Sequence, residues 1–415
     1  MRLICTGDWH LGNLFHGNDR LPEQRQFLSW LLTQTQELQP DALLVAGDVF
    51  DNSNPSAAAQ ALYYEFLVEL HRSCPSMVIV IPAGNHDSAA RLEAPRTLLG
   101  SHNVEVRGQI HRHWENDNWV TDYDDLMIPV SDGKGGEIVV LAVPFLRNDI
   151  LRCNDYQEGV KDFIAELLRR ARELYPGRKL VMMAHLYASG AEIAGKDASE
   201  RIIVGGQEMV NMGGLEEYPD YLTCGHIHKR QKIAGLPNAR YSGSVLPMSF
   251  AEKDYRHGVD LVEISQDGIE VEQLVYTPAH RLLVMPDDDE GLPPKKLMKL
   301  LDKELSDREA GALDGNYDYL AVKVILDRVD KDELKAIEDL ISRKNAVLCK
   351  IQRVLPNIDI STISGDRKMR SVDDILNRDP LETLREAFLV RHEHEMSDNQ
   401  KQMLQEIIDG IKSEI

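Results

Sequence analysis

Short apolar segments that end in metal-binding side chains recur along the first 230 residues of this sequence. The first three lead into the motifs D-W-H (residues 8–10), G-D-V-F-D (47–51) and G-N-H-D (84–87). Continuous apolar runs of this kind are typical of strands that are buried on both faces. Strands that end in aspartate, asparagine or histidine can present ligand atoms at one edge of a sheet. This pattern therefore constrains both the fold and the chemistry.

Two later apolar segments end in the same way. Residues 181–184 lead into His185, and residues 221–224 lead into the G-H-I-H motif at 225–228. Because successive side chains of a strand point to opposite faces, His226 and His228 are expected on the same side. A single strand-end histidine is more often a satisfied structural residue than a ligand. The five motifs in this order are far more specific than any one of them.

Amphipathic helices are predicted between these strands. Residues 22–39, 55–72 and 156–174 each place apolar side chains on one face at helical spacing. Residues 101–137 are less regular and predict strand edges and loops. Alternating strands and helices predict a layered α/β domain over residues 1–280. Ligands of such domains gather beyond the carboxyl ends of the strands, where all five motifs lie.

A change of pattern near residue 281 predicts a domain boundary. Residues 281–294 combine four successive acids with proline and glycine, and are interpreted as an acidic linker. Helix and strand patterns over residues 295–356 predict a small α+β domain, including a helix capped by Asp330. Apolar stripes predict C-terminal helices over residues 357–415. These stripes need a cover, either the small domain or another chain.

Length and charge narrow the functional classes. The chain has 415 residues, which favours two or three domains, and a formal net charge of −21. Such an acidic chain has no broad basic face for nucleic acid, so binding to DNA would need metal ions or a partner. The sequence contains no apolar run of bilayer length and no signal-peptide pattern, so a cytoplasmic location is expected. The five cysteines form no C-x-x-C pair and are interpreted as buried thiols.

The residue types in the motifs define the kind of metal site. Carboxylates, imidazoles and an amide oxygen together form a mixed oxygen and nitrogen site, which suits manganese or iron better than magnesium or calcium. Three acid or amide side chains and four histidines are too many ligands for one ion. They predict a pair of divalent ions about 3.5–4 Å apart that share one bridging carboxylate.

The ordered motifs, with D-W-H-L-G at residues 8–12 and a strict G-N-H-D, resemble those of the calcineurin-like metallophosphoesterases. Within that family, the chain is most similar to the SbcD group of bacterial nucleases. The resemblance covers residues 1–275 by motif and extends more loosely to the C-terminus. It implies a layered β-sandwich flanked by helices. It also implies that the small α+β domain is a capping domain, which covers the active site and contacts DNA.

The resemblance implies a role for each motif residue. The ligands of one ion, expected to be Mn²⁺, would be Asp8, His10, Asp48 and His228. The ligands of the second Mn²⁺ would be Asp48, Asn85, His185 and His226. Asp48 would then be the bridge. His86 would face the scissile phosphate and protonate the leaving oxygen, while Asp87 would orient the imidazole of His86.

Three further positions have two interpretations each. His16 lies where related nucleases place side chains near DNA, but a solvated loop histidine is the favoured interpretation. The turn at Ser242, Gly243 and Ser244 resembles one whose backbone amides approach a phosphate, or it is an ordinary turn into the next strand. Asp51 is interpreted as a turn or helix-capping residue rather than a metal ligand.

The resemblance implies a metal-dependent DNA nuclease, an exonuclease on duplex ends and an endonuclease on single strands or hairpins. It would work with an SbcC-type coiled-coil ATPase in DNA repair and recombination, through helices in residues 371–415. A homodimer through helices near residues 55–70 and 88–100 is also expected. The alternatives are a phosphodiesterase for a small phosphoester or cyclic nucleotide, and a non-catalytic scaffold of the same fold.

Overall fold

The computed structural model describes residues 1–354 except 152, 154, 193–208, 237, 289, 309–312, 314 and 327–330, together with residues 396 and 401. The chain divides into two compact units, Met1–Leu355 and Pro356–Ile415. All the labelled helices and strands lie in the first unit. The C-terminal helices predicted in residues 357–415 lie outside the described residues, apart from those two positions.

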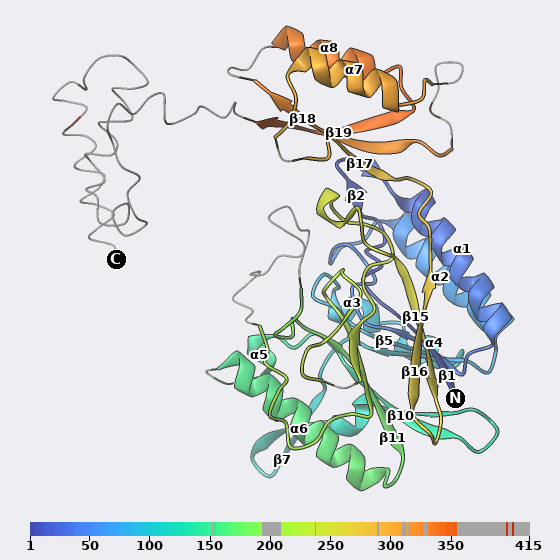
Figure 1. The fold of residues 1–415 in the computed structure, drawn as a ribbon. Helices are drawn as coiled ribbons and strands as arrows, with labels where there is room; N and C mark the ends of the chain where they lie inside the picture. Colours follow the sequence, from blue (N-terminus) through green and yellow to red (C-terminus); the bar gives the residue numbers. More distant parts are fainter. Residues whose placement is uncertain are drawn as a thin grey trace. The chain divides into compact units, whose positions relative to one another are not determined.

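Two six-stranded sheets form the body of the first unit (Figure 1). In spatial order, the first sheet contains β16 (Ile269–Val275), β15 (Gly258–Ile264), β1 (Arg2–Thr6), β4 (Ala42–Val45), β5 (Val78–Pro82) and β6 (Val104–Arg107). The second sheet contains β13 (Gln231–Lys232), β14 (Ala239–Tyr241), β12 (Tyr221–Gly225), β11 (Lys179–His185), β10 (Glu137–Val143) and β9 (Met127–Ser131).

Alternation of side chains explains how each sheet packs. In β1, Leu3 and Cys5 point into an apolar layer shared with Val140 and Met183 of the second sheet. Ile4 points the other way, into the core formed with α1 (Leu21–Leu38) and α2 (Ala57–Ser73). The second sheet packs in the same manner against α6 (Tyr156–Leu174). The predicted β-sandwich flanked by helices is therefore confirmed, and α6 has the predicted bounds.

Strand direction explains where the motifs meet. Strands β1, β4, β5 and β6 are parallel, and so are β10, β11, β12 and β14. Their carboxyl ends therefore lie at one edge of each sheet, and the motif loops begin there.

The irregular region at residues 101–137 has more regular structure than expected. It contains β6, a hairpin of β7 (Arg112–Glu115) and β8 (Asn118–Thr121), the short helix η1 (Tyr123–Leu126) and β9. Other short elements are the β2–β3 hairpin (Leu14–Phe15 and Asn18–Asp19), α3 (Ala89–Glu93), α4 (Arg96–Gly100), α5 (Asn148–Leu151) and η2 (Phe250–Glu252). Cys5, Cys74 and Cys224 are buried as expected, whereas Cys153 is exposed.

The small α+β domain is a three-stranded parallel sheet covered by two helices (Figure 1). Its elements are β17 (Leu282–Met285), α7 (Pro294–Glu304), β18 (Asp318–Ile325), α8 (Lys331–Ile341) and β19 (Ala346–Val354). The interpretation of all of residues 281–294 as a linker is wrong, because β17 lies within them and pairs with β18. Asp330, the predicted helix cap, lies outside the described residues.

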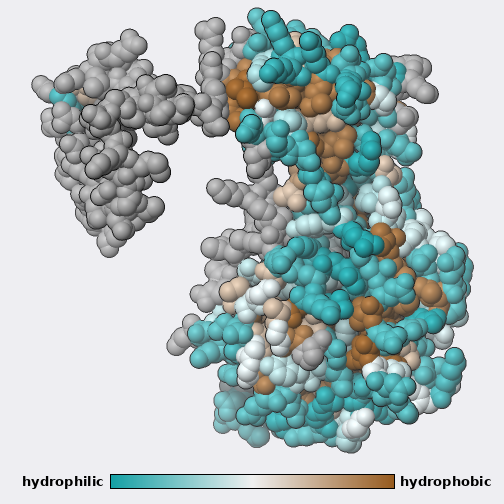
Figure 2. Space-filling model, in the orientation of Figure 1, coloured by the Kyte–Doolittle hydropathy of each residue, from teal (hydrophilic) through white to brown (hydrophobic). Residues whose placement is uncertain are grey.

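Hydrophilic residues cover most of the face in Figure 2, with separate hydrophobic patches over both the larger and the smaller domain. Among the helices within the described residues, none is both long and apolar enough to cross a membrane.

Candidate metal centre

The five motif loops meet at one edge of the sandwich. Hydrogen bonds join the loops that follow β1 and β4, from the amides of Asp8 and His10 to the carbonyls of Gly47 and Asp48, at 3.1 and 3.0 Å. The amide of His226, after β12, donates to Asp8 Oδ1 at 2.9 Å. The centre is therefore built by loops from both sheets.

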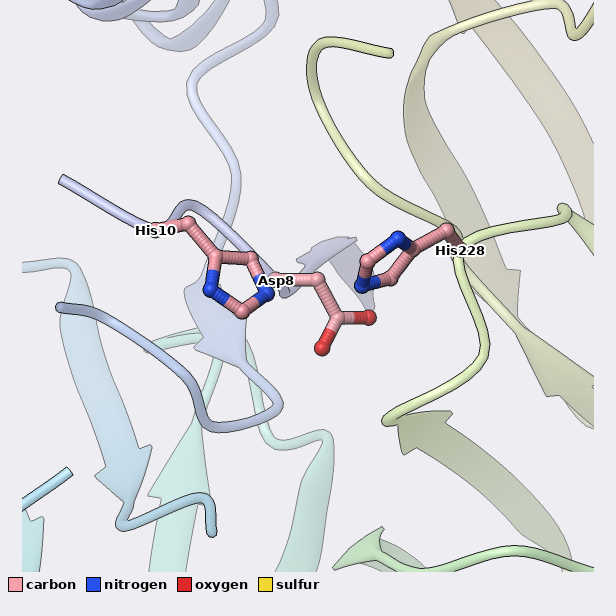
Figure 3. A group of neighbouring side chains, drawn as sticks. All are labelled: Asp8, His10 and His228. Atoms are coloured by element: carbon pink, nitrogen blue, oxygen red, sulfur yellow. The ribbon is translucent and has the colours of Figure 1, made fainter. Parts of the chain in front are cut away.

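Asp8, His10 and His228 form the first half of the centre. One ligand atom from each lies within 4.8 Å of the other two, and all three side chains are buried. Figure 3 shows their carboxylate and imidazole groups close together, with Asp8 between the two rings. Two chain segments more than 200 residues apart thus supply one compact set of oxygen and nitrogen donors.

Asp48, Asn85, His185 and His226 form the second half. His185 Nε2 lies 3.3 Å from Asp48 Oδ2 and 2.8 Å from Asn85 Oδ1. Asn85 Oδ1 also lies 3.0 Å from His226 Nδ1. Asp48 forms close groups with Asp8 and His185, and with His10 and His86. All seven side chains predicted as ligands are therefore brought together, and Asp48 lies next to both halves.

The donor atoms of the centre fit divalent metal ions. Both ring nitrogens of His10 are buried and have no hydrogen-bond partner among the described residues. An unpaired buried polar atom carries a desolvation cost, which a metal ion would remove. His185 Nδ1 donates to the carbonyl of Ala46 at 2.8 Å, so its Nε2 is the atom directed at Asp48 and Asn85. Such a mixed set of carboxylate, amide and imidazole donors suits divalent metal ions.

The two carboxylates respond differently to burial. Burial raises the pKa of Asp8, although His185 and His228 oppose this shift. Burial acts on Asp48 in the same direction, but the attraction of His185 and a hydrogen bond from it hold the pKa of Asp48 below its usual range. Asp48 is therefore the carboxylate that stays ionised most readily.

The pKa values of the imidazoles are also shifted in different directions. Burial lowers the pKa of His226 to about 3 and that of His10 well below its usual value. Burial acts on His185 in the same direction, but the charge of Asp48, a hydrogen bond to it, the charge of Asp8 and the bond to Ala46 together raise the pKa of His185 to about 9. His10 and His226 are thus neutral and can donate lone pairs at neutral pH, whereas a metal ion must displace a proton from His185.

Several of these residues have a strained backbone conformation. Asp8, His10, Asp48 and His226 have φ values of 50°, 45°, 48° and 96°, in a region that side chains other than glycine rarely adopt. Such conformations cost free energy and cluster at functional sites, where the surrounding structure maintains them.

His86 lies at the open side of the centre. Its side chain is exposed, and its ring centroid is 4.8 Å from that of His10. Its amide donates to Asp48 Oδ1 at 2.8 Å, and its Nδ1 donates to the carbonyl of Asp51 at 2.8 Å. These two bonds fix the ring beside the metal-binding side chains.

Asp87 does not orient His86, and this prediction is wrong. The buried carboxylate of Asp87 accepts hydrogen bonds from the amides of Val49, Phe50 and Gly84, at 3.2, 3.0 and 2.9 Å. It therefore ties the loop after β4 to the loop after β5.

Asp51 performs the orienting role through its backbone carbonyl. Its side chain accepts a hydrogen bond from Asn13 Nδ2 at 2.8 Å and lies 3.6 Å from His10 Nδ1. These contacts do not make Asp51 a helix cap, because the N-cap of the following helix α2 is Ser56. Sequence reasoning could not find the bond to His86, because any residue could supply that carbonyl.

The weaker assignments lie outside the centre. His16 is exposed, and its ring contacts those of Phe15 and Phe250, with centroids 4.9 and 5.4 Å away. The amides of Ser242 and Ser244 donate to the carbonyls of Cys224 and His228, at 3.3 and 3.0 Å.

The turn at residues 242–244 therefore supports the loop of His228. The amide of Ser242 is engaged by β12 and that of Ser244 by the loop of His228, so neither of these two amides is available to a phosphate. A Cβ atom at Gly243 would lie 2.7 Å from the carbonyl oxygen of His228, so this close packing requires glycine.

Sequence reasoning also missed Glu252. This side chain is fully buried, and its Oε1 lies 3.4 Å from His228 Nδ1. A lone glutamate in a segment without a recognised motif carries no signal of such a contact.

A second cluster of potential ligands lies away from the centre. Glu93, His111 and Asp125 have ligand atoms within 4.8 Å of one another. Arg96 pairs with both Glu93 and Asp125, and Arg107 also approaches Asp125, at 3.8 Å. The cluster is thus an ion-pair network rather than an array of free ligands.

Comparison with known proteins agrees with this geometry. Residues 1–230 match the family described as calcineurin-like phosphoesterase. The chain is 39% identical over 278 residues to SbcD of the SbcCD nuclease from Rhodobacter capsulatus, which covers 64% of this chain and 67% of that protein. It is 33% identical over 304 residues to SbcD from Escherichia coli K12, covering 69% and 71%. SbcD from Bacillus subtilis is 33% identical over 271 residues, covering 63% and 66%.

Proposed function

Because this chain belongs to the calcineurin-like phosphoesterase family, and its relatives above are SbcD components of SbcCD nucleases, we propose that it is a metal-dependent DNA nuclease. It hydrolyses DNA phosphodiester bonds at the centre described above. It acts as an exonuclease on duplex ends and as an endonuclease on single strands or hairpins. The observation that carries this proposal is the convergence of seven potential ligands beside the exposed His86.

We assign two Mn²⁺ ions to this centre. The ligands of one are Asp8, His10, Asp48 and His228. The ligands of the other are Asp48, Asn85, His185 and His226. When bound, two such ions supply Lewis acidity and positive charge to a phosphodiester. The position of Asp48 next to both groups, and its readily ionised carboxylate, support its role as the bridge.

His86 is assigned as the proton donor to the leaving oxygen. Its Nδ1 donates to the carbonyl of Asp51, so Nε2 of the protonated ring is the atom that can donate to substrate. Its exposure gives a phosphodiester access from solvent.

The test of this function is cleavage of a labelled DNA hairpin in the presence of Mn²⁺. The wild-type chain should cut it, and His86→Ala should bind Mn²⁺ equally well but turn over about 100-fold more slowly or worse. His113→Ala, which removes an exposed histidine of the β7–β8 hairpin, is the matched control and should cut normally.

Equal turnover by His86→Ala and the wild type would remove His86 from the mechanism. Release of phosphate from small phosphoesters without DNA cleavage would favour the alternative substrate class. Binding of Mn²⁺ without either activity would favour the scaffold.

We also propose that an SbcC-type coiled-coil ATPase binds this chain through residues 371–415. The support is the name of the relatives, which are components of SbcCD, and the apolar stripes of this segment. Deletion of residues 371–415 should abolish co-purification with the ATPase and leave Mn²⁺ binding intact. Unchanged co-purification would contradict the assignment.

A further inference from the structure

The capping domain contacts the chain segments that flank one half of the metal centre. An apolar cluster joins Phe15 and Phe250 to side chains of the small domain's sheet, namely Leu282, Tyr319 and Ala321. Phe15 lies in the β2–β3 hairpin, which follows the D-W-H motif, and Phe250 is the first residue of η2. The domain therefore packs against segments next to the half formed by Asp8, His10 and His228.

A buried ion pair lies at the same contact. Arg20 Nε and Nη2 donate to Glu23 Oε1 and Oε2 at 3.0 and 2.8 Å, and both side chains are buried. The hydroxyl of Tyr319, from β18, donates to Glu23 Oε1 at 2.9 Å. The guanidinium of Arg20 lies over the rings of Phe15 and Tyr319, at 5.2 and 5.8 Å from their centroids. Tyr319 thus connects the capping domain to this ion pair.

A series of further contacts links this ion pair to His228. Arg20 Nη1 donates to the carbonyl of Pro247. In the segment that follows, Glu252 Oε2 accepts a hydrogen bond from the amide of Met248 at 2.9 Å. Glu252 Oε1 accepts one from Ser249 Oγ at 3.1 Å and lies 3.4 Å from His228 Nδ1. A carboxylate at Nδ1 orients an imidazole and leaves Nε2 for a metal.

The other half of the centre is held by different groups. His185 Nδ1 donates to the carbonyl of Ala46, and Asn85 Oδ1 lies between His185 and His226. These contacts come from the loops after β4 and β5 and from the second sheet. A change at Tyr319 should therefore reach one half of the centre and not the other.

We propose that Glu252 is a positioning residue for His228, and that docking of the capping domain through Tyr319 sets the metal affinity of the half formed by Asp8, His10 and His228. This inference rests on the proposed function, because it takes that half as a metal site. A substrate or partner that displaces the capping domain would then lower the occupancy of one ion and leave the other bound. The small α+β domain would then regulate the centre.

The test is calorimetric titration of the full-length, metal-free chain with Mn²⁺, resolved into two sites. Glu252→Gln should weaken one site by about 10- to 100-fold, the usual effect of removing a carboxylate behind a ligand. Tyr319→Phe removes one oxygen atom and should weaken the same site by about fivefold. The second site should be unchanged in both variants.

Tyr317→Phe is the matched control. Tyr317 packs against the same apolar cluster, and its hydroxyl lies 3.4 Å from that of Tyr319. Since the described hydrogen bond to Glu23 comes from Tyr319, the control should bind both ions like the wild type. Thermal unfolding of each metal-free variant checks that the fold is retained.

The outcomes separate this inference from the proposed function. A wild-type chain that does not bind two ions would contradict the proposed function. Two ions bound by the wild type, with equal affinities in Tyr319→Phe, would overturn the inference alone. If Glu252→Gln does not fold, the Mn²⁺ affinities of Tyr319→Phe still test the inference.

A double variant tests the path between the two residues. If Tyr319 acts through Glu252, then Tyr319→Phe should add little to the loss of affinity caused by Glu252→Gln. Fully additive losses would mean that Tyr319 acts independently of Glu252, and would contradict the path.

Discussion

Gly84 allows the loop after β5 to approach Asp48. A Cβ atom at this position would lie 2.1 Å from Asp48 Oδ1 and 2.3 Å from its amide nitrogen. Gly225 allows a similar approach, since its Cβ would lie 2.0 Å from the carbonyl oxygen of Ala46. The glycines of G-N-H-D and G-H-I-H are thus required by packing around the centre.

Gly84→Ala should therefore displace Asp48 and damage the centre. We expect it to lower the free energy of unfolding by about 1–3 kcal/mol, as for other overpacked sites, and to weaken Mn²⁺ binding. Urea unfolding and Mn²⁺ titration measure the two effects. Gly100→Ala is the control, because a Cβ there would meet nothing within 4 Å. Wild-type stability and affinity in Gly84→Ala would refute the packing argument.

At the scale of residues, the short motifs were enough to predict which side chains come together. Each predicted ligand follows an apolar strand, so the rule for parallel sheets is enough to bring the ligands together. The partners of these ligands could not be predicted in this way. Asp87 bonds backbone amides, and Glu252 approaches His228 from a separate segment, so both contacts depend on tertiary structure.

Helices and strands could be predicted from the sequence where their runs of apolar residues are long. The principal strands and helices of the sandwich follow the period of their apolar residues. The strand β17 was missed, since its four residues adjoin the acidic segment 287–290 and resemble the start of a linker. Its partner β18 begins more than 30 residues later, and no local pattern indicates that pairing.

The helices α2 and α4, which lie in the two segments expected to form a homodimer interface, carry exposed apolar side chains. Tyr64, Val68 and Leu98 are 37%, 53% and 68% exposed. The combined change Val68→Asp and Leu98→Asp should convert the dimer into a monomer, because carboxylates would be buried at the interface.

Light scattering after size exclusion measures this change. Leu174→Asp is the control, since Leu174 is a 42% exposed leucine at the end of α6, outside these helices. A wild-type chain that is already monomeric, or a double variant that stays dimeric, would contradict this interface.

At the scale of the whole molecule, the fold brings potential metal ligands from both sheets together at one edge of the sandwich. The chain that carries them is acidic. The formal net charge is −21, so the protein as a whole repels DNA. Bound cations at the edge of the sandwich would supply local positive charge where a phosphodiester must approach. The proposed pair of cations is therefore what allows so acidic a protein to bind DNA at this edge.

Diffraction from crystals grown with Mn²⁺, recorded at the manganese absorption edge, tests that claim most directly. We expect two anomalous peaks per chain about 3.5–4 Å apart, both within coordination distance of Asp48. One peak should also contact Asp8, His10 and His228, and the other Asn85, His185 and His226. A single peak, or peaks away from Asp48, would contradict the account.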